Sequence, residues 1–312
     1  MINLGHIFSK LQAREHAGLF FAGLALVLAV GALGTAQFLA RPEPVVVETP
    51  APAPNPYGKV VLTAKAAIVY DLITGEVLYE KNAEAQLPLA SLTKLLTLYA
   101  AADALAGGAP VPMTAASLAQ EGDNGFSEGE RFTFTELAKL ALVASSNDAA
   151  DAIAVAAERS RGMDKEQLLA AAGSAVGLSQ TYTLNGTGLD ESSIISGGYG
   201  SARDMALLAG AFLERVPGIA RATLNATVSA TSLDGRSYTL ENTNPEVSTI
   251  PGLRLSKTGY TDLAGGNLAI VFDAGMNHPI AVVVLGSTRE ERFSDVDKLV
   301  RATASSFAGL LP

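Results

Sequence analysis

The stretch PLASLTKLLTLYA, residues 88–100, places a serine three residues before a lysine at the start of an apolar run. Pro88 restricts the backbone that precedes the serine, and the apolar residues that follow predict a helix over residues 91–106. Residues three apart lie on one face of a helix, so the side chains of Ser91 and Lys94 are expected to meet. Two interpretations follow: a helix start with a capping serine and a surface lysine, or a nucleophile with its base.

The second interpretation places a demand on the lysine. Lysine acts as a base only where burial or a neighbouring cation lowers its pKa. Leu92, Leu95 and Leu96 flank Lys94 in the sequence and would supply that burial. A serine at a helix N-terminus also benefits from the partial positive charge there when an oxyanion develops. The pattern alone is weak, because serines often cap helices.

A second cluster, ASSNDAA at residues 144–150, contains Ser145 and Asn147. Serine, asparagine and aspartate all favour helix caps and the turns between helices, so a helix boundary explains the cluster without any function. The functional interpretation needs a hydroxyl that passes a proton and a carboxamide that holds a substrate amide. The cluster by itself does not decide between them.

A third cluster lies in LRLSKTGYTDLAGGNLAIVF, residues 253–272, with Lys257, Thr258 and Gly259 in succession. A strand that begins beside a glycine turn would explain it structurally. In the functional interpretation, the lysine and threonine at a strand edge bind a carboxylate. The glycine would let a substrate backbone approach closely.

Composition restricts the possible chemistry. The chain has 312 residues, 48% of them apolar, which suits one large domain or two small ones. A net charge of −9 argues against a nucleic-acid partner. There is no cysteine, which excludes disulfides, thiolate metal sites and cysteine nucleophiles. The three histidines, His6, His16 and His278, are too few and too scattered for a histidine-rich zinc site or a Ser-His-Asp triad, so no metal is expected.

The N-terminal region predicts a membrane anchor. Residues 17–40 carry no charge, and as a helix they would span about 36 Å, against about 30 Å for a hydrocarbon core. Lys10 and Arg14 precede them, so a cytoplasmic tail at residues 1–16 and an exported remainder are expected. A cleaved signal peptide ending near residues 34–36 is the alternative, and it would give a secreted protein.

The rest of the chain predicts a spacer and one α+β domain. Residues 41–57 are rich in proline and favour an extended linker, and residues 58–312 form the globular part. A hairpin turning at residues 71–76 opens this part, Thr135 is expected to cap a helix, and a last helix is expected at residues 295–310. Strands at both ends with helices between them predict that the terminal strands share one sheet.

Taken together, the three clusters indicate a family. SLTK, SSN and KTG follow one another in the order typical of class A β-lactamases and penicillin-binding proteins. The resemblance extends to the segments AIVYDLITGEVLYEKNAEAQLPLASLTKLLT, NGTGLDE, SARDMALLA, ENTNPEV and PGLRLSKTGYTDLAGGNLA. Over about residues 60–290 the chain resembles the serine-type D-alanyl-D-alanine carboxypeptidases, the low-molecular-mass penicillin-binding proteins. This resemblance implies the β-lactamase/transpeptidase-like fold, an antiparallel sheet flanked by helices on both sides. The uncharged N-terminal residues predict one transmembrane helix before it.

The resemblance also implies roles for individual residues. Ser91 would attack the penultimate D-alanine carbonyl of a peptidoglycan stem pentapeptide and form an acyl-enzyme. Lys94 would take the serine proton, and Ser145 would relay a proton to the leaving D-alanine. Asn147 would hold the peptide and help to position Lys94. The expected partners are therefore peptidoglycan stem peptides and β-lactam antibiotics, together with the membrane, and no cofactor is implied.

The resemblance assigns the remaining roles to residues of the third cluster. Lys257 and Thr258 would recognise the terminal carboxylate of the substrate. The backbone amides of Ser91 and of Tyr260, the residue after Gly259, would form the oxyanion hole.

Two residues depart from the family pattern, and several activities share the same motifs. Leu255 stands where the family usually has glycine, and Gly186 where it commonly has proline, which puts the shape of the cleft in question. A D,D-endopeptidase and a β-lactamase are the alternatives within the enzyme class, although no dedicated loop carboxylate of the class A type is evident. An inactive wall-binding homologue is a third alternative, which the three intact motifs oppose.

Overall fold

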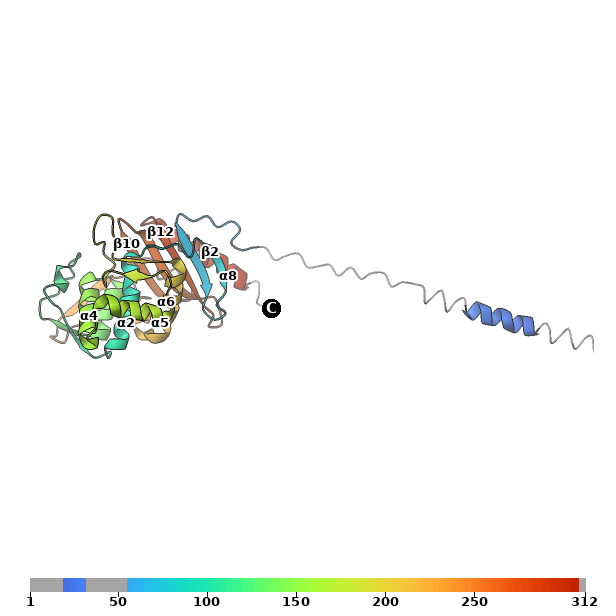
Figure 1. Cartoon of the computed structure of the whole chain (residues 1–312), viewed down its shortest axis with the longest axis horizontal. Helices are drawn as coiled ribbons and strands as arrows, with labels where there is room; N and C mark the ends of the chain where they lie inside the picture. The colour runs from blue at the N-terminus through green and yellow to red at the C-terminus, as the bar shows by residue number, and fades with distance from the viewer. Residues whose placement is uncertain (1–18, 32–54, 309–312) are drawn as a thin grey trace, which may run out of the picture. The chain divides into compact units, whose positions relative to one another are not determined.

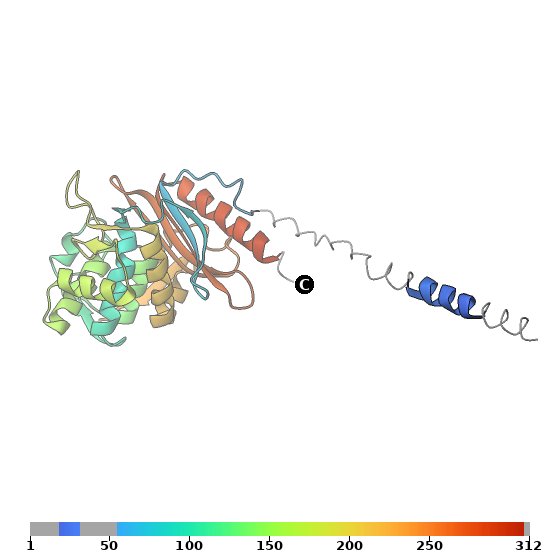
Figure 2. The ribbon, with the colours of Figure 1, turned by 45° about the vertical axis from the view of Figure 1, so that its right-hand side comes forward.

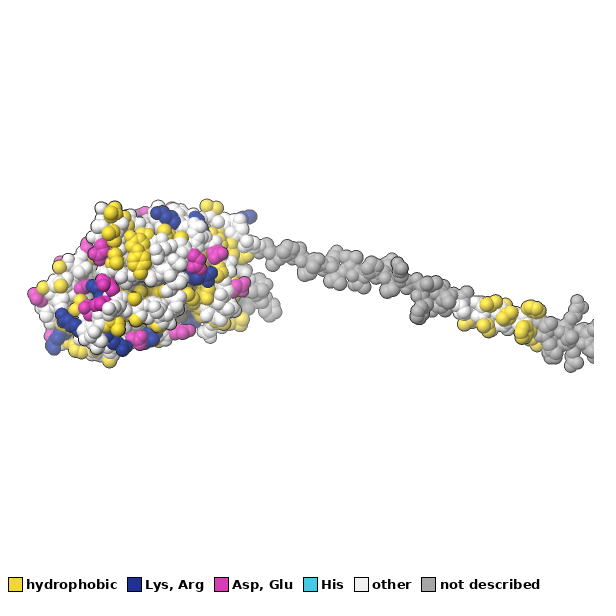
Figure 3. Space-filling model, viewed as in Figure 1, with side chains coloured by type: hydrophobic (Ala, Val, Ile, Leu, Met, Phe, Trp, Pro, Cys, Tyr) yellow, Lys and Arg dark blue, Asp and Glu magenta, His cyan; other side chains and the backbone are white. Residues whose placement is uncertain are grey.

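The computed structural model describes residues 19–31 and 55–308, which belong to two units, Met1–Ala53 and Pro54–Pro312. In the first unit, residues 19–31 form a helix with exposed, mostly apolar side chains (Figure 3). Within the part of the chain that is described, no helix has both the length and the apolar character needed to cross a membrane. The structure therefore does not confirm the predicted span at 17–40, whose two ends lie outside the described residues, as do the tail and most of the linker.

The second unit is built around a five-stranded antiparallel sheet in the order β10-β11-β12-β1-β2 (Figure 1). Its strands are β1 (Ala66–Asp71), β2 (Val77–Lys81), β10 (Leu253–Thr261), β11 (Gly265–Asp273) and β12 (Pro279–Ser287). The register pairs Ala66 with Leu285, so the first and last strands of the domain lie side by side. The predicted hairpin and the shared sheet are both confirmed.

The helices and minor strands occupy the rest of the domain. The helices are η1 (Ala90–Leu92), α2 (Thr93–Ala104), η2 (Ser117–Ala119), α3 (Phe134–Val143), α4 (Asn147–Arg161), α5 (Lys165–Val176), α6 (Ala202–Arg215), α7 (Pro217–Ala222) and α8 (Glu291–Ala308). The minor strands are β3 (Leu87–Pro88), β4 (Pro110–Pro112), β5 (Arg131–Thr133), β6 (Tyr182–Thr183), β7 (Gly198–Gly200), β8 (Thr227–Thr231) and β9 (Ser237–Glu241).

Both faces of the large sheet are covered, as predicted. Side chains alternate across a strand, so each strand contributes to two cores. Ile68, Val271 and Val283 belong to the core shared with α2 and α6, whereas Val69 and Ile270 belong to the core shared with α8. Figure 2 shows α8 lying along one face of the sheet, with the helical region on the other side. Burial on both faces explains why these strands are almost continuously apolar in the sequence.

Two predicted helix starts are wrong. The side chain of Thr133, not Thr135, caps α3 by accepting from the amide of Glu136, because pairing of β5 with β4 keeps Thr133 in an extended conformation. Helix α8 begins at Glu291 rather than 295, since Thr288 Oγ1 accepts from the amide of Glu291. Neither difference alters the topology.

Candidate active site

Ser91 lies in the η1 turn immediately before α2, and its side chain does not cap either helix. Its Oγ instead lies 2.7 Å from Lys94 Nζ. Ala90, the preceding residue, has a φ of +48°, a conformation that costs a non-glycine residue about 1–3 kcal/mol. The capping interpretation of this serine is therefore wrong, and the backbone beside it is strained.

Lys94 is completely buried, with an exposed fraction of 0%. Its Nζ donates to Asn147 Oδ1 at 2.7 Å and to the carbonyl of Thr187 at 2.9 Å. Burial lowers the pKa of Lys94 to about 7, so a large fraction of the amine is neutral at neutral pH. A neutral amine keeps two N–H donors and one lone pair. When protonated, Nζ donates to Ser91 Oγ as well. When neutral, it has both donors engaged by Asn147 and Thr187, which leaves its lone pair to accept from the Ser91 hydroxyl.

The second cluster lies at the junction before α4, where Ser146 supplies the helix cap. That leaves the side chains of Ser145 and Asn147 available for other contacts. Ser145 has a φ of +60°, and its Oγ accepts from Lys257 Nζ at 3.0 Å. Asn147 Nδ2 donates to the carbonyl of Glu121 at 2.6 Å, which turns its Oδ1 toward Lys94. The cluster thus forms a helix boundary, and two of its side chains also contact the lysines.

Lys257 lies in the middle of β10 and is as deeply buried as Lys94. Besides Ser145, it donates to the carbonyl of Thr258 at 2.7 Å. Burial lowers its pKa well below the ordinary value, and the nearby cations Lys94 and Arg292 lower it further. The three clusters predicted from the sequence therefore meet at one place in the fold.

Strand β10 forms an edge of the large sheet and packs against η1. A Cβ atom on Gly259 would lie 2.9 Å from the carbonyl oxygen of Leu89, so the absence of a side chain lets β10 pack closely against the backbone just before Ser91.

The open edge of β10 also presents backbone amides. The amide of Ser256 donates to Thr223 Oγ1, outside the sheet. Amides two residues apart on a strand point the same way, so the Tyr260 amide also faces the open edge.

Sequence reasoning missed Arg292, which α8 places beside this edge. Arg292 is 6% exposed, and its Nη1 donates to the carbonyl of Gly259 at 2.8 Å. Among the described residues its Nε has no hydrogen-bond partner. Burial lowers its pKa to about 10, so it remains a cation at neutral pH. In the sequence it resembles an ordinary surface arginine of an amphipathic helix, and only the fold brings it to the site.

Two asparagines, also missed, hold the backbone of the site. Asn267 Nδ2 donates to the carbonyls of Pro88 and Leu89, at 3.0 Å each, and so ties the segment before Ser91 to β11. Asn185 Oδ1 accepts from the amide of Thr187 and thereby shapes the loop that supplies the third contact of Lys94. Both asparagines occur in the segments GGNLA and NGTGLDE, which carried the resemblance but no assigned role.

Comparison with known proteins shows to which family the chain belongs. The model of a family described as D-alanyl-D-alanine carboxypeptidase matches residues 51–289. The chain belongs to the D-alanyl-D-alanine carboxypeptidase family. It is 32% identical over 252 residues to D-alanyl-D-alanine carboxypeptidase DacF of Bacillus subtilis, covering 78% of this chain and 63% of that protein. A D-alanyl-D-alanine endopeptidase of Pseudomonas aeruginosa is 29% identical over 250 residues, covering 77% of each chain. This chain therefore spans less than two thirds of the length of the carboxypeptidase relative from Bacillus.

Solved structures share the fold of this family. Penicillin-binding protein D2 from Listeria monocytogenes, in its ampicillin-bound form, is 27% identical with a TM-score of 0.67. The match covers 78% of this chain and 98% of that one. D-alanyl-D-alanine carboxypeptidase DacD from Francisella tularensis has the same fold, with a TM-score of 0.70 at 23% identity, covering 86% of this chain and 74% of that one. The β-lactamase/transpeptidase-like fold predicted for the globular part is confirmed for the second unit.

The two departures from the family pattern have packing explanations. Leu255 is completely buried in the core between the sheet and the helical region. At Gly186 a Cβ atom would lie 2.9 Å from the Cβ of Ala154, and the Gly186 carbonyl accepts from Thr97 Oγ1. Both positions are thus engaged in internal packing of the domain.

The described residues contain no group of three or more histidine, aspartate or glutamate side chains placed to hold a metal ion. His278, the one histidine of the catalytic unit, lies 2.6 Å from Asp71 Oδ2 through its Nε2, at the end of β1. The side chains of the site come from serine, lysine, asparagine, threonine and arginine residues, and backbone groups complete it.

Proposed function

We propose that this protein is a serine-type D,D-carboxypeptidase that removes the terminal D-alanine from peptidoglycan stem pentapeptides. The observation that carries the proposal is the buried Lys94, whose pKa is about 7. Two oxygen acceptors hold its Nζ, which lies 2.7 Å from Ser91 Oγ. Membership of the carboxypeptidase family supplies the substrate class.

Acylation begins when the neutral amine of Lys94 takes the proton of Ser91. Ser91 Oγ then forms a bond to the carbonyl carbon of the penultimate D-alanine. Negative charge develops on the carbonyl oxygen, and the amides of Ser91 and Tyr260 stabilise it; one such donor typically contributes about 3–4 kcal/mol. The C–N bond breaks as Ser145, linked to Lys257, gives its hydroxyl proton to the nitrogen of the leaving D-alanine. Ser145 then regains a proton from Lys94, so the proton removed from Ser91 ends on the leaving amine and Lys94 is neutral again.

The hydrogen-bond donors beside β10 orient the substrate. Lys257, Thr258 and Arg292 surround the place where the terminal carboxylate would lie, and Arg292 raises the local positive potential. Asn147 holds the peptide while keeping its Oδ1 on Lys94. Water then hydrolyses the ester on Ser91, which releases the shortened peptide. The residues of this chain supply every proton transfer, so the proposal needs no cofactor.

We extend the proposal to antibiotics and to location. The Listeria relative was solved with ampicillin and with cefotaxime bound, and the same fold supports β-lactam acylation of Ser91 here. The uncharged residues 17–40, of which 19–31 are helical, support single-pass anchoring with the catalytic unit outside the cell membrane. A cleaved signal would instead give a secreted enzyme.

Covalent labelling tests the nucleophile. The full chain in detergent is incubated with fluorescent penicillin, beside Ser91→Ala and the control Ser229→Ala, an exposed serine on β8. We expect a stable adduct on the parent and the control and none on Ser91→Ala. Equal labelling of Ser91→Ala would refute the assignment. Rapid loss of the adduct would favour a β-lactamase, and no adduct on the parent would favour an inactive wall-binding protein.

A further inference from the structure

The loop of residues 185–191 contacts both sides of the candidate active site. Asn185 holds the loop in shape, because its Oδ1 accepts from the amides of Thr187 and Gly188. The carbonyl of Thr187 in turn holds Lys94 at 2.9 Å. The residues that follow Thr187 take no part in the steps proposed above, although they approach the two peptide units that would supply the oxyanion hole.

One of these approaches is to the peptide unit that precedes Ser91. The Ala90 carbonyl and the Ser91 amide belong to this planar unit, so the position of the carbonyl restricts the direction of the amide. A Cβ atom on Gly188 would lie 1.9 Å from the Ala90 carbonyl oxygen, far closer than van der Waals contact allows. Glycine is therefore required here, and the loop limits where the Ser91 amide can lie.

Asp190 ties the same loop to the end of β10. Its Oδ1 accepts from Thr261 Oγ1 at 3.0 Å, and its Oδ2 lies 3.4 Å from the amide of Leu263 in the β10–β11 turn. Thr261 Oγ1 also accepts from the amide of Ala264 at 3.2 Å, while it donates its own proton to Asp190. Thr261 directly follows Tyr260, whose amide is the second donor of the proposed oxyanion hole.

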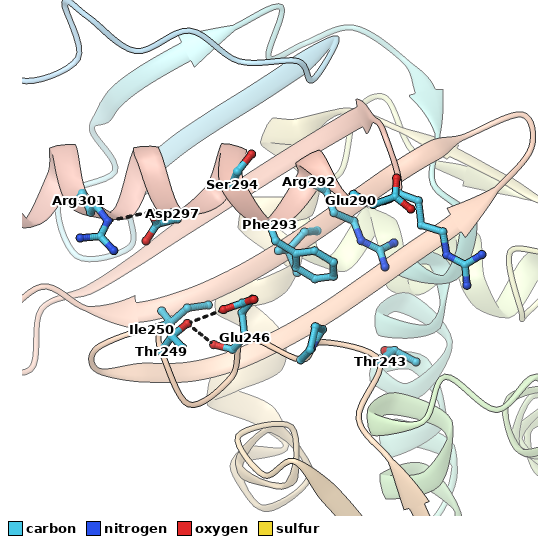
Figure 4. Close-up of a pocket in the computed structure, with 13 residues that line it drawn as sticks. Thr243, Glu246, Thr249, Ile250, Glu290, Arg292, Phe293, Ser294, Asp297 and Arg301 are labelled. Carbon is cyan, nitrogen blue, oxygen red and sulfur yellow. Dashed lines mark hydrogen bonds and ion pairs between the residues drawn. The ribbon is translucent and has the colours of Figure 1, made fainter.

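The peptide unit between Gly259 and Tyr260 is also held at its carbonyl. Arg292 projects from α8 and lines the pocket of about 730 Å³ drawn in Figure 4. Its Nη1 donates to the Gly259 carbonyl at 2.8 Å. This carbonyl and the Tyr260 amide lie in one plane, so Arg292 fixes the direction of the donor. The contact of Asp190 with Thr261 fixes the chain on the other side of the same donor.

We propose that Asp190 is a positioning residue that sets the spacing between the two amide donors of the oxyanion hole. The inference rests on the proposed function, because it takes Ser91 as the nucleophile and the amides of Ser91 and Tyr260 as the donors. The loop reaches the first donor at Gly188 and the second through Asp190, two residues later. A change at Asp190 therefore alters the position of one donor relative to the other.

The spacing matters because one transition-state oxygen must accept hydrogen bonds from both amides. Each donor has to lie about 2.7–3.1 Å from that oxygen. Loss of a whole donor typically slows the reaction about a hundredfold to a thousandfold. Removal of the Asp190 carboxylate leaves both amides in the site but frees their spacing, so the expected loss is smaller.

The test follows acylation of the full chain in detergent by fluorescent penicillin over a range of concentrations, which separates the binding constant from the acylation rate constant. Asp190→Ala should lower the rate constant about thirtyfold and leave the binding constant unchanged. Asp190→Asn keeps an oxygen acceptor for Thr261 and should restore most of the rate. Asp262→Asn removes an exposed carboxylate of the same turn and is the matched control, which should behave as the parent.

Further measurements distinguish positioning from a merely structural role. Rates are compared under conditions where urea denaturation shows every variant to be folded. Thr261→Val removes only the donor and should lower the rate constant about fivefold. Added to Asp190→Ala it should cost little more, because both changes remove the same hydrogen bond. The pH midpoint of acylation should stay at about 7, since Lys94 keeps its burial and its partners.

The outcomes separate this inference from the proposed function. Unchanged rate constants in Asp190→Ala and Thr261→Val, with a parent that is acylated normally, would refute the positioning role alone. A shifted pH midpoint would also refute it, because the loop would then act through Lys94 rather than through the amides. If Asp190→Ala does not fold, the rate constant of Thr261→Val decides. A parent that takes up no penicillin would refute the proposed function, and the positioning role with it.

Discussion

The start of α2 and the middle of β10 each bury one lysine, yet the two lysines differ in what surrounds them. Lys94 is held by two oxygen acceptors and faces Ser91, and burial alone lowers its pKa. Lys257 contacts Ser145, and its pKa is lowered by burial and also by two neighbouring cations. Burial thus makes a lysine able to accept a proton, and its partners decide which proton: Lys94 faces the Ser91 hydroxyl, whereas Lys257 faces the Ser145 hydroxyl.

Exchanging each lysine for arginine gives the largest expected effects and tests this difference directly. Arginine cannot lose its proton at working pH, so Lys94→Arg should slow penicillin acylation about a thousandfold. Lys257→Arg keeps a hydrogen-bond donor for Ser145 and removes no group that takes the Ser91 proton, so it should slow acylation only about tenfold. Stopped-flow or gel-based labelling measures both rates, with the surface variant Lys139→Arg as control. Equal losses at the two positions would contradict the division of roles.

The pH dependence of acylation should follow Lys94. Below a pKa of about 7 the amine is protonated and cannot accept from Ser91, so the rate should fall about tenfold for each pH unit below that value. Above pH 8 the rate should reach a plateau. A profile of penicillin acylation between pH 5 and pH 9 measures this midpoint. A rate independent of pH across that range would exclude Lys94 as the base.

Removal of Arg292 should affect only the β10 side of the site. Arg292→Gln leaves Lys257 with one cationic neighbour fewer and weakens carboxylate binding, so kcat/KM on pentapeptide should fall about fivefold. The midpoint of the acylation profile should stay near pH 7, because burial rather than Arg292 sets the pKa of Lys94. Steady-state kinetics and the same pH profile test this against Arg159→Gln, an exposed control. A shifted midpoint would show that the two lysines titrate together.

The smallest expected effect is on the free energy of unfolding, and it concerns a residue other than the two lysines. Asp148, next to Asn147, is buried with its Oδ1 unpartnered among the described residues, and burial raises its pKa to about 6. The folded state therefore holds this proton more tightly than the unfolded state, and stability declines as pH rises from about 4 to 6. Asp148→Asn should raise the free energy of unfolding above pH 6 by about 1 kcal/mol.

Urea denaturation at pH 7.5 and at pH 4 checks the Asp148 prediction. At pH 4 the carboxyl is protonated in the folded protein, so the variant should match the parent there. A gain of equal size at both pH values would mean that the burial of the charge is not the cause.

The sequence predicted the large sheet and the three clusters because their signals are local. Continuous apolar strands and a glycine turn mark the sheet, and the motifs stand in a fixed order along the chain. Which of several adjacent hydroxyls caps a helix was not predictable, since Ser145 and Ser146 have the same chemistry and only the backbone at the junction separates them. Arg292 and the Thr187 carbonyl were missed because tertiary packing alone brings them to the lysines.

Pairing of β1 with β12 has a consequence for how the protein matures. Contacts between the two ends of a domain form late in folding, because the whole intervening chain must first be arranged. Lys94 becomes a base only once it is buried, and β10, which packs against the η1 turn that carries Ser91, comes from a distant part of the chain. An incomplete or unfolded chain thus carries an ordinary protonated lysine beside an unreactive serine.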